Sequence, residues 1–213
     1  MFPFTTSVAE AFVNAGGGRK PPVVESIGSG AGLKRFCEGA GWEFPDIANA
    51  SRRIKKSEYA QCEKNGVGEI LEVEIGVDGV ALAEANNGPR FQLSKKDIYL
   101  ALGASPGGKP NAAQTWHDVN PALPAVPIEG VAPTYAAIAD GRYPGARPLY
   151  LYVKKRHLRA VPGLGDFLAL YTTMWNPGGK LVKRGLIAAP DAVRAHSRAI
   201  VAQGIPLDPA GLK

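Results

Sequence analysis

The sequence predicts an α/β fold in which helices and strands alternate along the chain. Helical and strand-like patterns follow one another, with short connections that contain Gly and Pro, and this order is typical of layered α/β domains. The 213 residues, 45% of them hydrophobic, suffice for one such domain with a full core or for two small ones. No stretch approaches the roughly 18 apolar residues that span a membrane.

Apolar residues at helical spacing indicate helices with recognisable ends. The first is expected to stop at the glycines 16–18. Ser57 is the expected N-cap of a helix that closes at residues 65–66, and Ser94 precedes another. Asp191 lies near the positive end of the last one. The predicted helices cover 5–15, 32–39, 55–66, 93–102, 161–175 and 190–204.

Apolar and β-branched runs predict the strands between these helices. They cover 22–26, 45–51, 69–85 and 147–155, and the run 69–85 is expected to turn at Asp78 and continue as a second strand. The stretch 120–145 is rich in Pro and Gly, so we interpret it as a junction between layers.

Basic residues concentrate toward the C-terminal end of a chain with net charge +6. The segment Arg142–Lys213 holds 12 Lys and Arg against 3 Asp and Glu. The positive electrostatic potential of this segment attracts phosphate-bearing partners. Pro, Gly and apolar residues interrupt the charge, however, whereas nucleic-acid readers show a denser basic stripe, often with stacking aromatics. We expect no nucleic-acid partner.

The residues that serve catalysis or metal binding show no recognisable arrangement. His117, His157 and His196 lie far apart, and none shares a spacing with a nucleophile or with carboxylates. Cys37 and Cys62 have no CxxC partner, so they are either two buried thiols or one disulfide. The sequence predicts no enzyme, no cofactor and no metal site.

The stretch "SIGSGAGLKRF" at 26–36 is glycine-rich at the start of a predicted helix. It lacks the spacing of a phosphate-binding Walker loop, and a dinucleotide turn needs an acidic residue at the end of the next strand. Asp46 stands at the beginning of that strand instead. Ser29 and the backbone N–H groups from Gly30 onward are better suited to a compact oxyanion at a helix N-terminus.

A second polar segment, 49–56, follows the next predicted strand. It places Asn49, Ser51 and Arg52 where loops gather at the carboxyl ends of parallel strands. Arg52 is suited to hold an oxyanion through two hydrogen bonds. The alternative is a surface charge at the start of a helix.

Several long stretches carry a resemblance to a known family. They read "FPFTTSVAEAF", "VVESIGSGAGLKRFCEG", "PDIANASRRIKKSEYAQCEKNGV", "EILEVEIGVDGVALA", "LSKKDIYLAL", "GVAPTYAAIADGRYPGARPLYLYVKK" and "PGLGDFLALYTT". In this order they resemble the phosphate-binding proteins of phosphate ABC importers, over nearly the whole chain. The resemblance implies a three-layer lobe of the periplasmic-binding-protein type II, with a mixed, mostly parallel sheet and helices on both faces.

The same resemblance implies a function. Such proteins are non-catalytic periplasmic or extracellular receptors that bind inorganic phosphate between two lobes and deliver it to an ABC permease. The start "MFPFTTSVAE" shows no signal-peptide pattern. The resemblance also implies a disulfide between Cys37 and Cys62.

The resemblance assigns roles to particular residues. Ser29 matches the serine that binds phosphate from the helix N-terminus, and Phe2 matches a residue whose backbone N–H points at phosphate. Arg52 stands where many members have an aspartate that accepts the phosphate proton, so discrimination against sulfate by that proton is in doubt. With Gly30 and Ser51, these residues form the expected phosphate site.

Two departures from the family matter. The family's first strand is missing before Phe2, and the chain passes from Glu129 to Gly130 where a second lobe is expected. We therefore expect a single lobe, 1–213, whose parts 1–129 and 130–213 rejoin at that point, with weakened phosphate binding. The alternative is a receptor-lobe scaffold or interaction protein without a ligand. Unpaired sheet edges would favour a strand-exchanged homodimer.

Overall fold

The computed structural model of the chain describes residues 1–16, 20–82, 93–111 and 129–213. These residues divide into two compact units. The larger unit comprises Met1–Asp78 and Arg147–Lys213, and the smaller unit comprises Gly79–Ala146. The residues predicted to bind phosphate all belong to the larger unit.

A three-stranded sheet lies at the centre of the larger unit, in the order β1-β3-β2. Strand β1 (Ile47–Ala50) pairs antiparallel with β3 (Ala146–Lys154), so that Ala50 lies opposite Tyr150. Strand β2 (Ile70–Gly79) lies on the other side of β3.

Hydrogen bonds at both ends of β2 and β3 fix the direction of this second pairing. At one end the Lys155 N–H donates to the Glu69 carbonyl, and at the other the Val80 N–H donates to the Gly145 carbonyl, at 2.9 and 3.0 Å. Residues that follow one strand thus meet residues that precede the other, which defines an antiparallel pair.

The α/β fold with helices on both faces of the sheet is confirmed, but the predicted strand directions are wrong. Strands β1 and β2 run the same way, yet β3 lies between them and pairs antiparallel with each. The reason lies in the chain path. The chain leaves the larger unit at the end of β2 and returns at the start of β3, so β3 runs back along β2.

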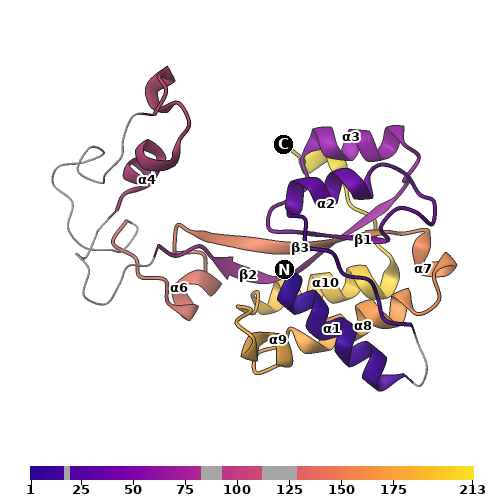
Figure 1. Ribbon diagram of the computed structural model, residues 1–213. Helices are drawn as coiled ribbons and strands as arrows, with labels where there is room; N and C mark the ends of the chain where they lie inside the picture. Colours follow the sequence, from indigo (N-terminus) through magenta and orange to yellow (C-terminus); the bar gives the residue numbers. More distant parts are fainter. Residues whose placement is uncertain (17–19, 83–92, 112–128) are drawn as a thin grey trace. The chain divides into compact units, whose positions relative to one another are not determined.

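Helices cover the two faces of this sheet (Figure 1). Helices α1 (Phe2–Ala15), α8 (Leu164–Met174) and α10 (Asp191–Gln203) lie on one face. Helices α2 (Ser29–Phe36) and α3 (Lys56–Lys64) lie on the other. The larger unit is therefore a three-layer α/β/α structure.

Side-chain alternation along the strands builds one hydrophobic core on each face. Leu71, Val73 and Ile75 of β2 are fully buried in the core that α1 and α8 complete. Ile70 and Tyr152 point to the opposite face, into the core shared with α2 and α3.

The remaining helices among the described residues are short. In the larger unit they are α7 (His157–Ala160), α9 (Lys180–Lys183) and the 3-10 turn η2 (Pro209–Gly211). In the smaller unit they are α4 (Lys95–Leu102), the 3-10 turn η1 (Pro106–Gly108) and α6 (Tyr135–Ala139). Ser94 caps α4 as predicted, since its hydroxyl accepts the Asp97 N–H at 3.1 Å.

Two local predictions are wrong. Residues 22–26 form no strand: Pro21 and Pro22 have no N–H to donate to a ladder, and Val23 is 90% exposed. Helix α3 begins at Lys56 rather than after Ser57, because the Glu58 carboxylate accepts the Lys55 N–H at 2.9 Å and fixes the first turn.

Two other predictions fall partly on residues that the structure leaves undescribed. The strand expected after Asp78 would reach residues 83–85, and the junction 120–145 includes 120–128; both of these segments lie outside the described residues, as does His117.

Candidate functional site

The start of α2 offers backbone N–H groups without a protein cap. Gly28, the N-cap, has φ +80°, a conformation that L side chains rarely adopt, and no side chain caps this end of the helix. The first N–H groups of a helix have no partner within the helix. The segment from Ser29 to Ala31 therefore presents hydrogen-bond donors at the positive end of the helix dipole.

Ser29 and Ser51 meet at this helix end, although they are 22 residues apart in the sequence. The Ser51 N–H donates to Ser29 Oγ at 3.0 Å, and the two hydroxyl oxygens lie 3.2 Å apart. The contact requires close packing of α2 on β1. The two elements meet at Gly32, where a Cβ would be in ordinary van der Waals contact with the Asn49 carbonyl oxygen, at 4.0 Å.

Arg52 lies on the same side of α2. Its Nη2 is 4.0 Å from the position that a Cβ on Gly30 would take. The guanidinium forms a two-pronged ion pair with Glu58, with Nη1 to Oε2 at 2.9 Å and Nη2 to Oε1 at 2.7 Å. The hydrogen bonds between them raise the pKa of Arg52 and lower the pKa of Glu58, so both groups stay charged near neutral pH.

Side chains of the sheet hold the loop 51–55 in place. Arg53 Nε donates to Glu72 Oε1 at 2.8 Å, and the Tyr152 hydroxyl donates to Glu72 Oε2 at 2.8 Å. The Ile54 N–H donates to the same Tyr152 hydroxyl oxygen at 2.7 Å. Buried groups of β2 and β3 thus hold the backbone that carries Ser51 and Arg52.

The first turns of α1 approach β1 through a buried polar link. Thr5 Oγ1 donates to Asn49 Oδ1 at 3.1 Å and lies 3.2 Å from the Tyr171 hydroxyl. Burial raises the pKa of Tyr171 above its ordinary value. Thr5 thus links α1 to β1 through Asn49 and to α8 through Tyr171.

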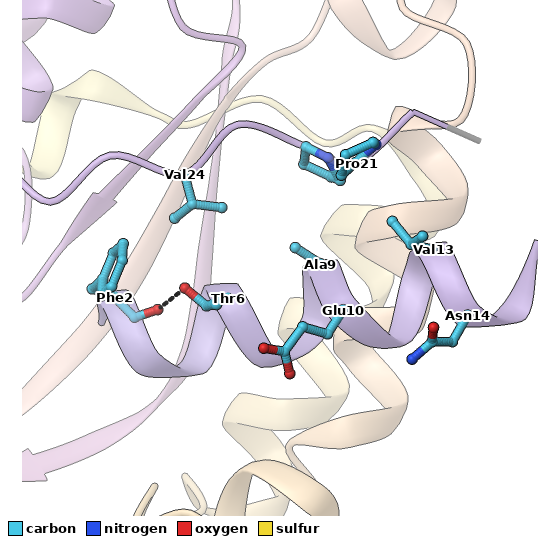
Figure 2. A pocket seen from close by; sticks show the side chains of 9 residues that line it. Phe2, Thr6, Ala9, Glu10, Val13, Asn14, Pro21 and Val24 are labelled. Carbon is cyan, nitrogen blue, oxygen red and sulfur yellow. Dashed lines mark hydrogen bonds between the residues drawn. The ribbon is translucent and has the colours of Figure 1, made fainter. Parts of the chain in front are cut away.

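Phe2 is placed differently from the other predicted site residues. Its side chain is 44% exposed and lines a groove of about 460 Å³ between α1 and the segment that contains Pro21 and Val24 (Figure 2). Its carbonyl accepts the Thr6 hydroxyl at 3.0 Å. No described hydrogen bond joins Phe2 to Ser29 or to the rest of the cluster.

The contacts of the described residues therefore bring Ser29, Gly30, Ser51 and Arg52 together. The side chain of Phe2 lines the separate groove, and the role expected of its backbone N–H stays a prediction. The sequence reasoning missed Glu58, which holds Arg52. The sequence does contain a signal for it. Glu58 lies three residues after Lys55, at the start of a predicted helix, and a carboxylate in that position caps the helix.

The predicted disulfide between Cys37 and Cys62 is confirmed. Cys37 is the C-cap residue of α2, and Cys62 lies in α3. The bond therefore links the helix whose N-terminus carries Ser29 to the helix that carries Glu58. Both sulfurs are buried in the core between α2, α3 and the sheet.

A second polar cluster has a structural role. His157 Nδ1 lies 2.5 Å from Asp46 Oδ1, and its Nε2 lies 3.2 Å from the Ala40 carbonyl oxygen. The buried Lys154 Nζ donates to the Gly39 carbonyl at 2.6 Å, and burial lowers the pKa of Lys154 to about 8. These bonds fix the loop after α2, so His157 is a packing histidine, as predicted.

The described residues contain no group of three or more His, Cys, Asp or Glu placed to hold a metal ion. No helix among them is long and apolar enough to cross a membrane.

The comparisons with known proteins identify the family to which this three-layer α/β unit belongs. The model of a family described as a PBP superfamily domain matches residues 1–130. The chain therefore belongs to the PBP superfamily.

Sequence relatives cover part of the same region. Protein SphX of Synechococcus elongatus is 31% identical over 133 residues, and protein SphX of a Synechocystis strain is 30% identical over 138 residues. Each match takes in 62% of this chain but only 37% of the relative's own length.

Solved structures share the fold along most of the chain. A possible phosphate binding protein from Planctomyces limnophilus aligns over 96% of this chain and 95% of its own, with a TM-score of 0.68 and 22% identity. A provisionally assigned phosphate ABC transporter substrate-binding protein from Clostridium perfringens, solved with bound phosphate, covers 89% and 96%, with a TM-score of 0.63 and 21% identity. An ABC-type phosphate transport receptor from Vibrio cholerae aligns over 87% of this chain and 95% of its own, with a TM-score of 0.60 and 17% identity. By their descriptions, these three structures are phosphate-binding or phosphate-transport proteins.

Proposed function

We propose that this chain binds inorganic phosphate as a solute-binding protein of an ABC-type importer, or as an isolated lobe of one. One observation carries the proposal. The hydroxyls of Ser29 and Ser51 and the guanidinium of Arg52 gather at the N-terminus of α2, an end that no described side chain caps, within the larger unit. Neutral and charged donors at a helix N-terminus suit a tetrahedral oxyanion.

The names of the relatives support phosphate in particular. One solved neighbour contains bound phosphate, and another is a phosphate transport receptor. On this proposal the protein acts in the periplasm or outside the cell and delivers phosphate to an importer's permease. The disulfide agrees with an oxidising compartment.

Binding is proposed to be weak. All the proposed ligand groups lie in the larger unit, which is built from Met1–Asp78 and Arg147–Lys213. We propose that this single lobe holds the ligand alone. A ligand held from one side keeps its water on the other, so each hydrogen bond contributes less than in a closed cleft.

Isothermal titration with phosphate tests the proposal, with Ser29→Ala as the diagnostic variant and Ser57→Ala, an exposed position of α3, as the matched control. We expect saturable binding weaker than micromolar, lost in S29A and kept in S57A. Sub-micromolar affinity from a monomer would contradict the single-lobe proposal. The absence of any saturable signal would contradict phosphate binding and leave the scaffold as the better description.

Self-association is a further part of the proposal. Strand β1 is an edge strand of four residues, and β2 is the other edge. Part of the β2 edge is already used within the chain, because Val77 and Ile187 exchange backbone hydrogen bonds. We therefore assign a strand-mediated homodimer, if one forms, to β1. Light scattering over a concentration range tests it, and a constant monomeric mass would contradict it.

A further inference from the structure

The hydrogen bonds of Arg52 leave one edge of its guanidinium open. A guanidinium has five N–H donors in one plane. Nη1 donates to Glu58 Oε2 at 2.9 Å and to the Arg53 carbonyl at 3.1 Å, which uses both of its protons. Nη2 donates once, to Glu58 Oε1 at 2.7 Å. The second Nη2 proton and the Nε proton share one edge, and no hydrogen bond among the described residues uses them.

This open edge lies at the proposed phosphate site. Nη2 is the atom 4.0 Å from the Cβ position of Gly30, the second residue of α2. Ser29, the first residue of α2, contacts Ser51, which directly precedes Arg52. The Nε–Nη2 edge is therefore the part of Arg52 that stands beside the uncapped helix end.

Glu58 fixes this orientation. Its carboxylate also accepts the Lys55 N–H at 2.9 Å, so the start of α3 holds it in place independently of Arg52. The pair is partly buried, with 35% of the Arg52 side chain and 22% of the Glu58 side chain exposed. A partly buried two-pronged pair fixes the plane of the guanidinium, which a single contact does not.

We infer that Glu58 is a positioning residue, an inference that rests on the proposed phosphate-binding function. Glu58 holds the far side of the Arg52 guanidinium so that the Nε–Nη2 edge faces the anion at the N-terminus of α2. Glu58 itself does not contact the ligand. The ligand class is a tetrahedral oxyanion that offers two oxygens to this edge.

The direction in which one substitution changes phosphate affinity distinguishes a positioning role of Glu58 from a purely electrostatic one. Glu58→Gln removes a negative charge close to an anion site, so a purely electrostatic role predicts tighter phosphate binding. The positioning role predicts weaker binding, by about fivefold, the effect of one hydrogen bond that loses its alignment. Gln can still cap α3 from the same position, so we expect the E58Q protein to fold.

A double-mutant cycle on phosphate affinity tests whether Glu58 acts through Arg52. Arg52→Lys keeps the positive charge but has no planar fork. We expect E58Q to weaken binding in the wild-type protein and to have no further effect in the R52K protein. The control is Glu38→Gln, which breaks the exposed Arg35–Glu38 pair at the other end of α2 and should leave affinity unchanged.

Two results would overturn the inference: tighter binding in E58Q, or equal weakening in both Arg52 backgrounds. The Nε–H resonance of Arg52 without phosphate gives a separate measurement of orientation. It should be distinct in the wild-type protein and averaged in E58Q, and an unchanged resonance would refute positioning even if phosphate binds. If the wild-type protein shows a fixed Arg52 but no saturable phosphate titration, the proposed function fails, and the ligand part of the inference fails with it.

Discussion

Hydrogen-bond donors dominate the residues around the start of α2. The open edge of Arg52 and the first backbone N–H groups of α2 have protons to give. The hydroxyls of Ser29 and Ser51 contact each other, so one of their two protons remains for a ligand. The described carboxylate of this cluster is Glu58, whose two oxygens accept hydrogen bonds from Arg52 and Lys55. A proton carried by the ligand therefore meets no free carboxylate among these described groups, and the serine hydroxyl oxygens are the acceptors that remain.

This arrangement predicts poor discrimination between phosphate and sulfate. A site that recognises a protonated oxyanion needs an acceptor for that proton, and Arg52 stands where such an acceptor is expected. We expect sulfate to displace phosphate with an affinity within about tenfold of it, the range of one hydrogen bond. Competition titration measures this, and failure of a large excess of sulfate to displace phosphate would show that a proton acceptor exists.

The raised pKa of Glu74 leads us to expect that the stability of the fold depends on pH. Burial on β2 and the neighbouring Glu72 raise the pKa of Glu74 to about 7 from an ordinary 4.5. The folded state therefore disfavours the ionised carboxylate, and stability decreases as the pH rises from about 4.5 through 7. Glu74→Gln removes this cost.

We expect E74Q to exceed the wild-type protein in free energy of unfolding by roughly 1–2 kcal/mol at pH 8, a value reduced because the side chain is partly exposed. The two proteins should differ little at pH 4. Urea unfolding at both pH values measures the difference, with the exposed Glu63→Gln on α3 as control. A gain of equal size at both pH values would assign the effect to packing instead.

Residue types and spacing were enough to predict Ser29, Ser51 and Arg52, because glycines before a helix and polar residues after a strand indicate an anion site. The partner of Arg52 could not be predicted in the same way. Its identification depends on where α3 begins, and one residue of difference in that start decides whether Glu58 caps the helix. Phe2 was assigned by resemblance alone, and the contacts of its side chain lie elsewhere.

At the scale of elements, the disulfide links the two helices that carry the candidate site. It closes a loop of 25 residues between α2 and α3. We expect its removal by Cys37→Ala with Cys62→Ala to lower the free energy of unfolding by roughly 2–4 kcal/mol. Phosphate affinity should also fall, because Glu58 and Ser29 would lose their fixed separation.

Urea unfolding and phosphate titration of this variant, beside wild-type protein with and without reductant, provide the measurement. Reduced wild-type protein should match the double variant. Unchanged phosphate affinity would show that packing of Leu33 and Phe36 suffices to place the helices.

Most elements could be predicted from local pattern, and the errors have local or topological causes. Helix α4 was predicted with its cap because Ser94 and Asp97 satisfy each other's backbone groups. The run at 22–26 has strand composition, but two preceding prolines remove the donors that a ladder needs. Strand direction depends on which strands become neighbours. The pairing of β3 with β1 joins residues 100 to 106 positions apart, such as Ala50 with Tyr150 and Ile47 with Val153, and local pattern does not reach that far.

At the scale of the molecule, the chain leaves the larger unit and returns to it at one point. Arg147 pairs with Asp78 at 2.8 Å, and the Val80 N–H donates to the Gly145 carbonyl. The end of β2 and the start of β3 are thus adjacent across an antiparallel pair. An antiparallel pair can be closed by a two-residue turn.

We therefore predict that the larger unit folds without the smaller one. In the variant, an Asn-Gly turn replaces residues 80–145 and joins β2 to β3 as a hairpin. Both hydrophobic cores, the disulfide and the cluster at the start of α2 lie outside the removed segment. We expect a cooperative thermal transition and a phosphate affinity within about threefold of the whole chain, less than the effect of one hydrogen bond.

Circular dichroism on heating and phosphate calorimetry check the two parts separately. Loss of the cooperative transition would show that the smaller unit is needed for folding. A folded variant with much weaker phosphate binding would show that Gly79–Ala146 supplies ligand contacts, and would contradict the proposal that one lobe carries the whole site. Introducing Ser29→Ala into the shortened chain then decides whether any remaining binding is at the N-terminus of α2, because only binding at that helix end depends on the Ser29 hydroxyl.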